Sequence, residues 1–147
     1  MKKLGKSSKK GFTLVELIVV IVILAVLAAM LVPALIGYVD RAKKEKDYQT
    51  ASTVYAAAQA AITEGYAKGE ITKPASGATA TITQSNTTVL ELAGVSSGKV
   101  KSFSFTYGPD LIITNGEVTI ENGGTTATYE MGTNGTWGPK ATNTVNG

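Results

Sequence analysis

The chain of 147 residues contains no cysteine and no histidine. Without cysteine it forms no disulfide and has no thiolate chemistry. Without histidine it lacks the commonest general base and the commonest metal ligand. These two absences count against an enzyme, and we expect neither a cofactor nor a bound metal.

Positive charge is concentrated at the N-terminus. The formal net charge is +3, from 14 basic and 11 acidic residues. Without residues 1–11 the chain keeps 9 basic residues against 11 acidic ones, a net charge of −2. The basic excess therefore belongs to the first segment, and it does not predict nucleic acid as a partner. The five basic residues of this segment are Lys2, Lys3, Lys6, Lys9 and Lys10.

The first segment, MKKLGKSSKKG, is short and basic and is typical of a targeting sequence. It ends at Gly11, directly before an apolar run. A secretory signal of the usual kind has its small residues after the apolar stretch, whereas here Gly11 precedes it. We therefore expect residues 1–11 to be a leader peptide.

Residues 12–39 form an apolar segment in which Glu16 is the only charged residue. As a helix this segment would span roughly 42 Å, which exceeds the roughly 30 Å hydrocarbon core of a bilayer. The segment is predicted to be a transmembrane helix. Pro33 is expected to kink or locally open this helix, and Gly37 is a second position where we expect the helix to be flexible.

Residues 40–69 are amphipathic, and we expect them to continue the same helix from about Phe12 to about Ala67. Charged residues lie at the start of this segment, and we expect them to form a solvated stretch of helix with salt bridges. The alternative is that they bind DNA. They are Asp40, Arg41, Lys43, Lys44, Glu45, Lys46 and Asp47. The predicted apolar stripe comprises Tyr48, Ala51, Val54, Tyr55, Ala58, Ile62 and Tyr66.

Residues 70–147 are rich in Thr, Gly, Asn and Ser, with short runs that favour strands. Three turn signals, Asn115-Gly116, Asn122-Gly123-Gly124 and Asn134-Gly135, indicate an antiparallel sheet of about four strands. Residues 138–147 are expected to be a mobile tail. The predicted fold is α+β, with the apolar half of a long N-terminal helix protruding and its amphipathic half packed on a β-rich head.

A helix that is apolar on every side needs apolar surroundings on every side. Lipid supplies these surroundings, and so does a bundle of identical helices from other subunits. The periodicity alone leaves two readings open, a signal anchor that holds the head at a membrane and a subunit that assembles.

Residues Lys10-Gly11, then Phe12-Thr13-Leu14-Val15-Glu16, then an unbroken apolar stretch to Met30 form one motif. This combination resembles the N-terminus of a type IV prepilin, of the type IVa kind. The resemblance is strong over residues 1–45 and concerns only the architecture in the rest of the chain. The chain departs from many Gram-negative members of the family in lacking a cysteine pair near its C-terminus, which would suit a Gram-positive source.

The resemblance implies that a membrane prepilin peptidase cuts between Gly11 and Phe12 and methylates the new Phe12 amine. The single-pass prepilin in the cytoplasmic membrane would then be added by the pilus assembly machinery to an extracellular helical homopolymer. Such filaments serve motility, adhesion or DNA uptake.

In such a filament, the resemblance implies that Glu16 pairs with the Phe12 amine of a neighbouring subunit. The alternative is an interfacial carboxylate that is stabilised by the helix N-terminus. The backbone around Pro33 would unwind in the filament, with Gly37 contributing. The alternative for Pro33 is an ordinary membrane-helix proline.

Three functions compete on the sequence. The first is a pilin subunit, the major one by its compact head and its retained Glu16. The second is a pseudopilin of a secretion or DNA-uptake apparatus. Against it, residues 122–147 hold one acidic residue, Glu130, where major secretion pseudopilins carry an acidic calcium loop. The third is a membrane-anchored enzyme or binding protein, for which the chain offers few catalytic groups.

Overall fold

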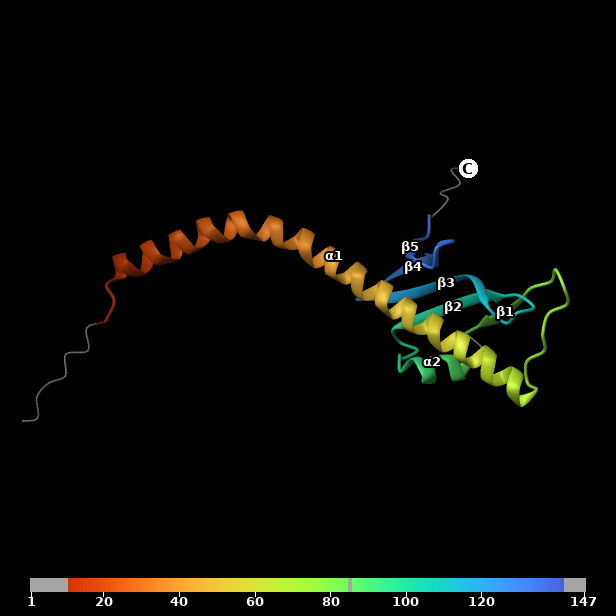
Figure 1. Cartoon of the computed structure of the whole chain (residues 1–147). Helices are drawn as coiled ribbons and strands as arrows, with labels where there is room; N and C mark the ends of the chain where they lie inside the picture. Colours follow the sequence, from red (N-terminus) through yellow and green to blue (C-terminus); the bar gives the residue numbers. More distant parts are fainter. Residues whose placement is uncertain (1–10, 85, 142–147) are drawn as a thin grey trace, which may run out of the picture. The chain divides into compact units, whose positions relative to one another are not determined.

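The computed structural model describes residues 11–84 and 86–141 (Figure 1). Nearly all of the predicted leader and the last six residues of the predicted tail lie outside the described residues. The chain divides between Ala42 and Lys43 into two compact units, and each is described by itself. The fold is α+β, as predicted. Its elements are α1 (Leu14–Lys68), β1 (Ala80–Thr83), α2 (Thr87–Ala93), β2 (Val100–Tyr107), β3 (Ile113–Asn122), β4 (Thr125–Met131) and β5 (Trp137–Pro139).

Helix α1 is a single helix of 55 residues. Eighteen consecutive residues of this helix have a mean hydropathy of 3.2, and none of them is buried. Every residue from Gly11 to Lys46 is exposed. The helix ends where the sequence placed its end, because Gly69 adopts a positive φ of 77° that favours glycine. The Glu70 amide then donates to the Gly65 carbonyl at 2.8 Å, which satisfies a terminal carbonyl.

The five strands form one antiparallel sheet in the order β1-β2-β3-β4-β5, so each strand pairs with its neighbour in sequence. The sheet has five strands where the sequence predicted about four, and the short strand β5 pairs with β4. Gly138 and Pro139 are therefore part of the sheet, and their assignment to a mobile tail was wrong. The indole of Trp137 packs edge-on against the ring of Phe105, with centroids 6.3 Å apart, and this contact holds the edge strand in place.

Two of the three predicted turns are confirmed. Asn122 pairs with Thr125, and the two residues between them, Gly123 and Gly124, have φ of 60° and 89°. This is the two-residue hairpin that an Asn-Gly-Gly sequence favours. Gly135, with a φ of 75°, lies in the connection between β4 and β5.

The predicted turn at Asn115-Gly116 is wrong, because both residues lie inside β3 and pair with Thr106 and Phe105 of β2. Gly116 has a packing role: a Cβ atom at this position would overlap the ring of Phe105. The glycine thus admits a large aromatic side chain into the core rather than reversing the chain.

The chain reverses instead between Tyr107 and Ile113, in a loop that α1 holds in place. The Gln59 amide nitrogen donates to the Leu111 carbonyl at 2.7 Å, and the Ile113 amide donates to the Gln59 side-chain oxygen at 3.0 Å. Leu111 has a φ of 65°, which is unfavourable for a residue with a Cβ atom. The two hydrogen bonds with the Gln59 side chain stabilise this conformation.

The core of the second unit lies between the sheet and the part of α1 beyond Lys46, with α2 alongside (Figure 1). Phe103, Phe105 and Tyr107 alternate along β2 and are all buried. The predicted helical stripe is correct at Ala51, Val54, Ala58 and Ile62, whereas Tyr48 and Tyr55 are only partly buried. Tyr66 is 44% exposed, so its assignment to the stripe was wrong. The buried face of α1 comprises Asp47, Ala51, Val54, Ala57, Ala58, Ala61, Ile62 and Gly65.

Candidate functional site

The predicted processing residues lie in a short exposed segment before α1. Gly11, Phe12 and Thr13 are not helical, and the first helical residue is Leu14. Phe12 is 85% exposed, and no atom lies within 4 Å of the position of a Cβ on Gly11. A peptidase needs an accessible backbone, and the Gly11–Phe12 bond lies in an exposed segment that is not helical.

Thr13 and Glu16 form a reciprocal pair of hydrogen bonds at the start of α1. The Thr13 amide donates to Oε2 of Glu16 at 3.2 Å, and the Glu16 amide donates to Oγ1 of Thr13 at 3.2 Å. This is a capping box, in which two amides without intrahelical partners are satisfied by side chains. The first backbone hydrogen bond of the helix follows from the Leu17 amide to the Thr13 carbonyl at 3.1 Å.

Sequence reasoning missed this role of Glu16, although the signal was present. A Ser or Thr followed three residues later by Glu, just before an apolar run, is the signature of a capping box. Glu16 therefore has two sequence-encoded properties. It is an acceptor for the Thr13 amide, and it is an exposed anion in the first turn of a helix, where the helix dipole favours negative charge.

The predicted flexible residues Pro33 and Gly37 lie well inside α1, which is helical on both sides of each. Both are exposed, and nothing lies within 4 Å of the position of a Cβ on Gly37. Pro33 donates no hydrogen bond to residue 29, so this turn has one backbone bond fewer than its neighbours. Unwinding at Pro33 in a filament stays a prediction.

Asp47 contradicts the prediction of a solvated charged stretch, because it is only 2% exposed. Its carboxylate accepts hydrogen bonds from the Tyr129 hydroxyl at 2.8 Å and from the Asn122 amide at 2.5 Å. The Lys99 ammonium lies 3.5 Å from the same carboxylate. Asp47 therefore joins α1 to β3, β4 and the segment before β2. The other six charged residues between Asp40 and Lys46 are exposed.

Burial and the Asp47 carboxylate both act on Tyr129. Burial is the main cause that raises the pKa of the Tyr129 phenol well above its ordinary value of 10.0, and the hydrogen bond to Asp47 raises it further. The phenol thus remains a donor to the carboxylate throughout the neutral range. A buried charge needs such donors, because an unpaired carboxylate in the interior is strongly unfavourable.

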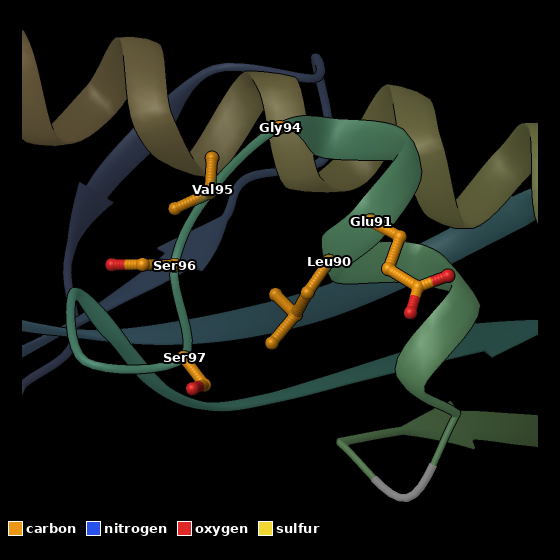
Figure 2. Close-up of a pocket in the computed structure, with 6 residues that line it drawn as sticks. All are labelled: Leu90, Glu91, Gly94, Val95, Ser96 and Ser97. Carbon is orange, nitrogen blue, oxygen red and sulfur yellow. The ribbon is translucent and has the colours of Figure 1, made fainter.

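A hollow of about 430 Å³ beside α2 offers little catalytic chemistry. It is lined by Leu90, Glu91, Gly94, Val95, Ser96 and Ser97 (Figure 2). Glu91 is its single ionisable side chain, so it lacks the pair of groups needed for acid–base catalysis. Within residues 11–84 and 86–141, no three acidic side chains come together as a metal site would require.

Comparison with known families identifies the N-terminal segment. Residues 6–32 match the family described as the prokaryotic N-terminal methylation motif. The searches of curated proteins and of solved structures found no significant match. The matched residues include Gly11, Phe12, Thr13 and Glu16 and most of the apolar segment of α1, but none of the head. The motif supports a type IV pilin-like prepilin or pseudopilin, and it implies processing by a prepilin peptidase.

Proposed function

We propose that this chain is the major structural subunit of an extracellular type IV pilus. It is made as a single-pass prepilin in the cytoplasmic membrane, cut after Gly11, methylated at Phe12 and polymerised through residues 12–39. The methylation motif over residues 6–32 is the observation that carries this proposal. Proteins with this motif are structural subunits.

The distribution of burial supports a subunit with two separate tasks. The head has its own core, which contains Val54, Ile62, Phe105 and Ile120 among its fully buried side chains. The segment from Phe12 to Val39 contributes nothing to that core, and its large apolar side chains are all exposed. Apolar surface of this extent is stable only in lipid or against other apolar helices. A subunit that moves from a membrane into a filament uses the same surface in both places.

In this proposal Glu16 determines the axial register in which neighbouring subunits assemble. Cleavage after Gly11 creates a cationic amine at Phe12, four residues before the carboxylate of Glu16. A lone carboxylate at the centre of a membrane costs at least about 2.5 kcal/mol on insertion scales. Pairing with the Phe12 amine of a neighbouring subunit relieves that cost, and a subunit in the wrong register leaves both charges unpaired.

The runner-up is a pseudopilin of a type II secretion or DNA-uptake apparatus, because the same N-terminal motif supports both. Residues 122–147 contain a single acidic residue, Glu130, where major secretion pseudopilins carry an acidic calcium loop, and this difference favours the pilin. A membrane-anchored binding protein is the third possibility.

Electron microscopy of material sheared from the cell surface, with mass spectrometry of its subunit, tests the proposal. We expect filaments whose main subunit begins with methylated Phe12. A chain found only in the membrane fraction, with filaments made of another subunit, would point to the pseudopilin. An uncut N-terminus would contradict both.

A further inference from the structure

A hollow of about 400 Å³ lies between α1, the segment before β2 and the β3–β4 turn. It is distinct from the capping box and from the hollow beside α2. Its walls combine three lysines with one acid, one amide and one glycine. They are Lys43, Lys46, Asp47, Lys99, Asn122 and Gly123.

The acid of this hollow is already satisfied. Asp47 is buried and accepts from Asn122, Tyr129 and Lys99, so its charge is balanced within the head. Lys99 in turn donates to Asp47, to the Glu121 carbonyl at 3.2 Å and to the Asn122 side chain. These contacts fix the Lys99 ammonium as a rigid part of the wall.

Lys43 and Lys46 have no such partners. Neither ammonium group forms an ion pair or a hydrogen bond with any residue in the described ranges 11–84 and 86–141, and both residues are exposed. The nearby acids Asp40 and Glu45 do not line the hollow. With Asp47 balanced by Lys99, the hollow has two free ammonium groups, and it suits a compact anion with several oxygen acceptors.

The place of this hollow in the sequence indicates where such an anion comes from. Lys43 follows Val39, the last residue of the apolar segment, by only four residues, about one turn of helix. If the chain is the membrane-anchored prepilin proposed above, Lys43 and Lys46 lie at the level of the lipid headgroups on the outer face of the membrane. Nucleic acid fits less well, because it needs an extended basic surface, and the chain without residues 1–11 has a net charge of −2.

We propose that this hollow binds the phosphate of an anionic phospholipid headgroup at the outer face of the membrane. This inference rests on the proposed prepilin. Lys43 and Lys46 donate to the phosphate oxygens, and Lys99 adds positive potential from the wall. The contact holds the head at the membrane surface until the subunit leaves for the filament.

Native mass spectrometry of the full-length chain in neutral detergent tests this site, with equal amounts of phosphatidylglycerol and phosphatidylcholine as probes. We expect about a tenfold preference for phosphatidylglycerol, as two lysine contacts to an anionic headgroup imply. The variant Lys43→Gln with Lys46→Gln should bind both lipids equally. Both side chains are exposed, so circular dichroism should show the fold unchanged.

The matched control is Arg41→Gln with Lys44→Gln. It removes the same charge from the same stretch of α1, but neither residue lines the hollow. The control should keep the preference. An equal loss in both variants would show a general attraction of basic residues to anionic lipid and would overturn the site.

Two further outcomes are decisive. Displacement of phosphatidylglycerol from the unchanged chain by an equal concentration of inorganic phosphate would assign the hollow to a soluble anion and overturn the lipid assignment. Resistance of the chain in vesicles to alkaline extraction tests the membrane anchor separately. A chain that is anchored but shows no lipid preference contradicts this inference alone, whereas a chain that is not anchored contradicts the proposed function.

Discussion

The hydroxyl of Tyr129 on β4 donates a hydrogen bond of 2.8 Å to the carboxylate of Asp47 on α1, across 82 residues of sequence. The rings of Tyr48 and Tyr129 also meet edge-on, with centroids 5.3 Å apart. The first turn of α1 that contacts the sheet is therefore held by one polar and one aromatic contact to the same residue. Each contact reinforces the other, because both need the same position of β4.

Replacing Asp47 should destabilise the head more than any other charge change in α1. Asp47→Leu removes the acceptor for Tyr129, Asn122 and Lys99 and leaves these donors partly buried. We expect a loss of about 3 kcal/mol in the free energy of unfolding. Urea unfolding of the full-length chain in detergent, followed by Trp137 fluorescence, measures it. The control Glu45→Leu changes an exposed acid two residues earlier and should cost less than about 1 kcal/mol. Equal effects would contradict the role of Asp47.

Stability should depend on Tyr129 at alkaline pH. The pKa of Tyr129 is raised in the folded state above its ordinary value of 10.0, chiefly by burial and then by Asp47. A group with a raised folded pKa contributes stability that is complete below the unfolded pKa and is lost as the pH rises through the folded pKa. The unchanged chain should therefore lose stability above about pH 10. Tyr129→Phe should lack this part of the loss, because it has no proton to release.

Thermal unfolding of both chains between neutral pH and pH 11 checks this expectation. At neutral pH the phenylalanine variant should be less stable by about 1 to 2 kcal/mol, because Asp47 loses one donor. The difference between the two chains should shrink as the pH rises beyond 10. Parallel curves over the whole range would show that Tyr129 does not contribute to the alkaline transition.

The two properties of Glu16 can be separated by mutation. Glu16→Gln keeps an acceptor for the Thr13 amide, since Gln also completes a capping box, but it removes the charge. Thr13→Val keeps the charge of Glu16 and removes the hydroxyl that accepts from the Glu16 amide. If an ion pair with Phe12 directs assembly, Glu16→Gln should be cleaved normally and give at least about tenfold fewer filaments, since one ion pair in a dry core exceeds about 1.4 kcal/mol.

Thr13→Val should cost about 1 kcal/mol at the helix start and should still assemble. Cleavage is measured by the mass of the membrane-bound subunit, and assembly by the quantity of sheared filaments. Hydrogen exchange of the Glu16 amide reports the capping box itself. Normal filament yield from Glu16→Gln would rule out the ion pair and leave the cap as the role of Glu16.

Gly116→Ala should destabilise the head, because its new methyl group would meet the ring of Phe105 in the middle of the core. Overpacking of this kind costs about 1 to 3 kcal/mol. Gly138→Ala is the control, since a Cβ at that position meets nothing within 4 Å and its φ is not in the left-handed region. Urea unfolding of both variants compares them. A stable Gly116→Ala protein would mean that the Phe105 ring moves aside easily.

The features that local sequence determines were predictable. The apolar run, the end of α1 near Ala67 and the Asn122-Gly123-Gly124 hairpin each depend on residues that are neighbours in the chain. The motif around Gly11 and Glu16 is equally local, which is why the resemblance to a prepilin followed from residues 1–45 alone.

The predictions were wrong where the environment of a residue depends on residues far away in the sequence. Asp47 follows six charged or polar neighbours and resembles them in sequence, but it lies four residues before Ala51 and shares that residue's buried face. Its partners Asn122 and Tyr129 are 75 and 82 residues away. Gly116 after Asn115 has the sequence of a turn, and only the ring of Phe105 on the neighbouring strand explains why it is a strand residue.

The capping box has one more consequence. Its two hydrogen bonds and the first backbone bond of α1 join residues 13, 16 and 17, all on the same side of the Gly11–Phe12 bond. A cut at that bond would break none of them, so the helix would begin at the same residue with or without the leader. Maturation would then alter the charge at the tip of the helix while leaving its shape alone, and a subunit could be cut without having to refold.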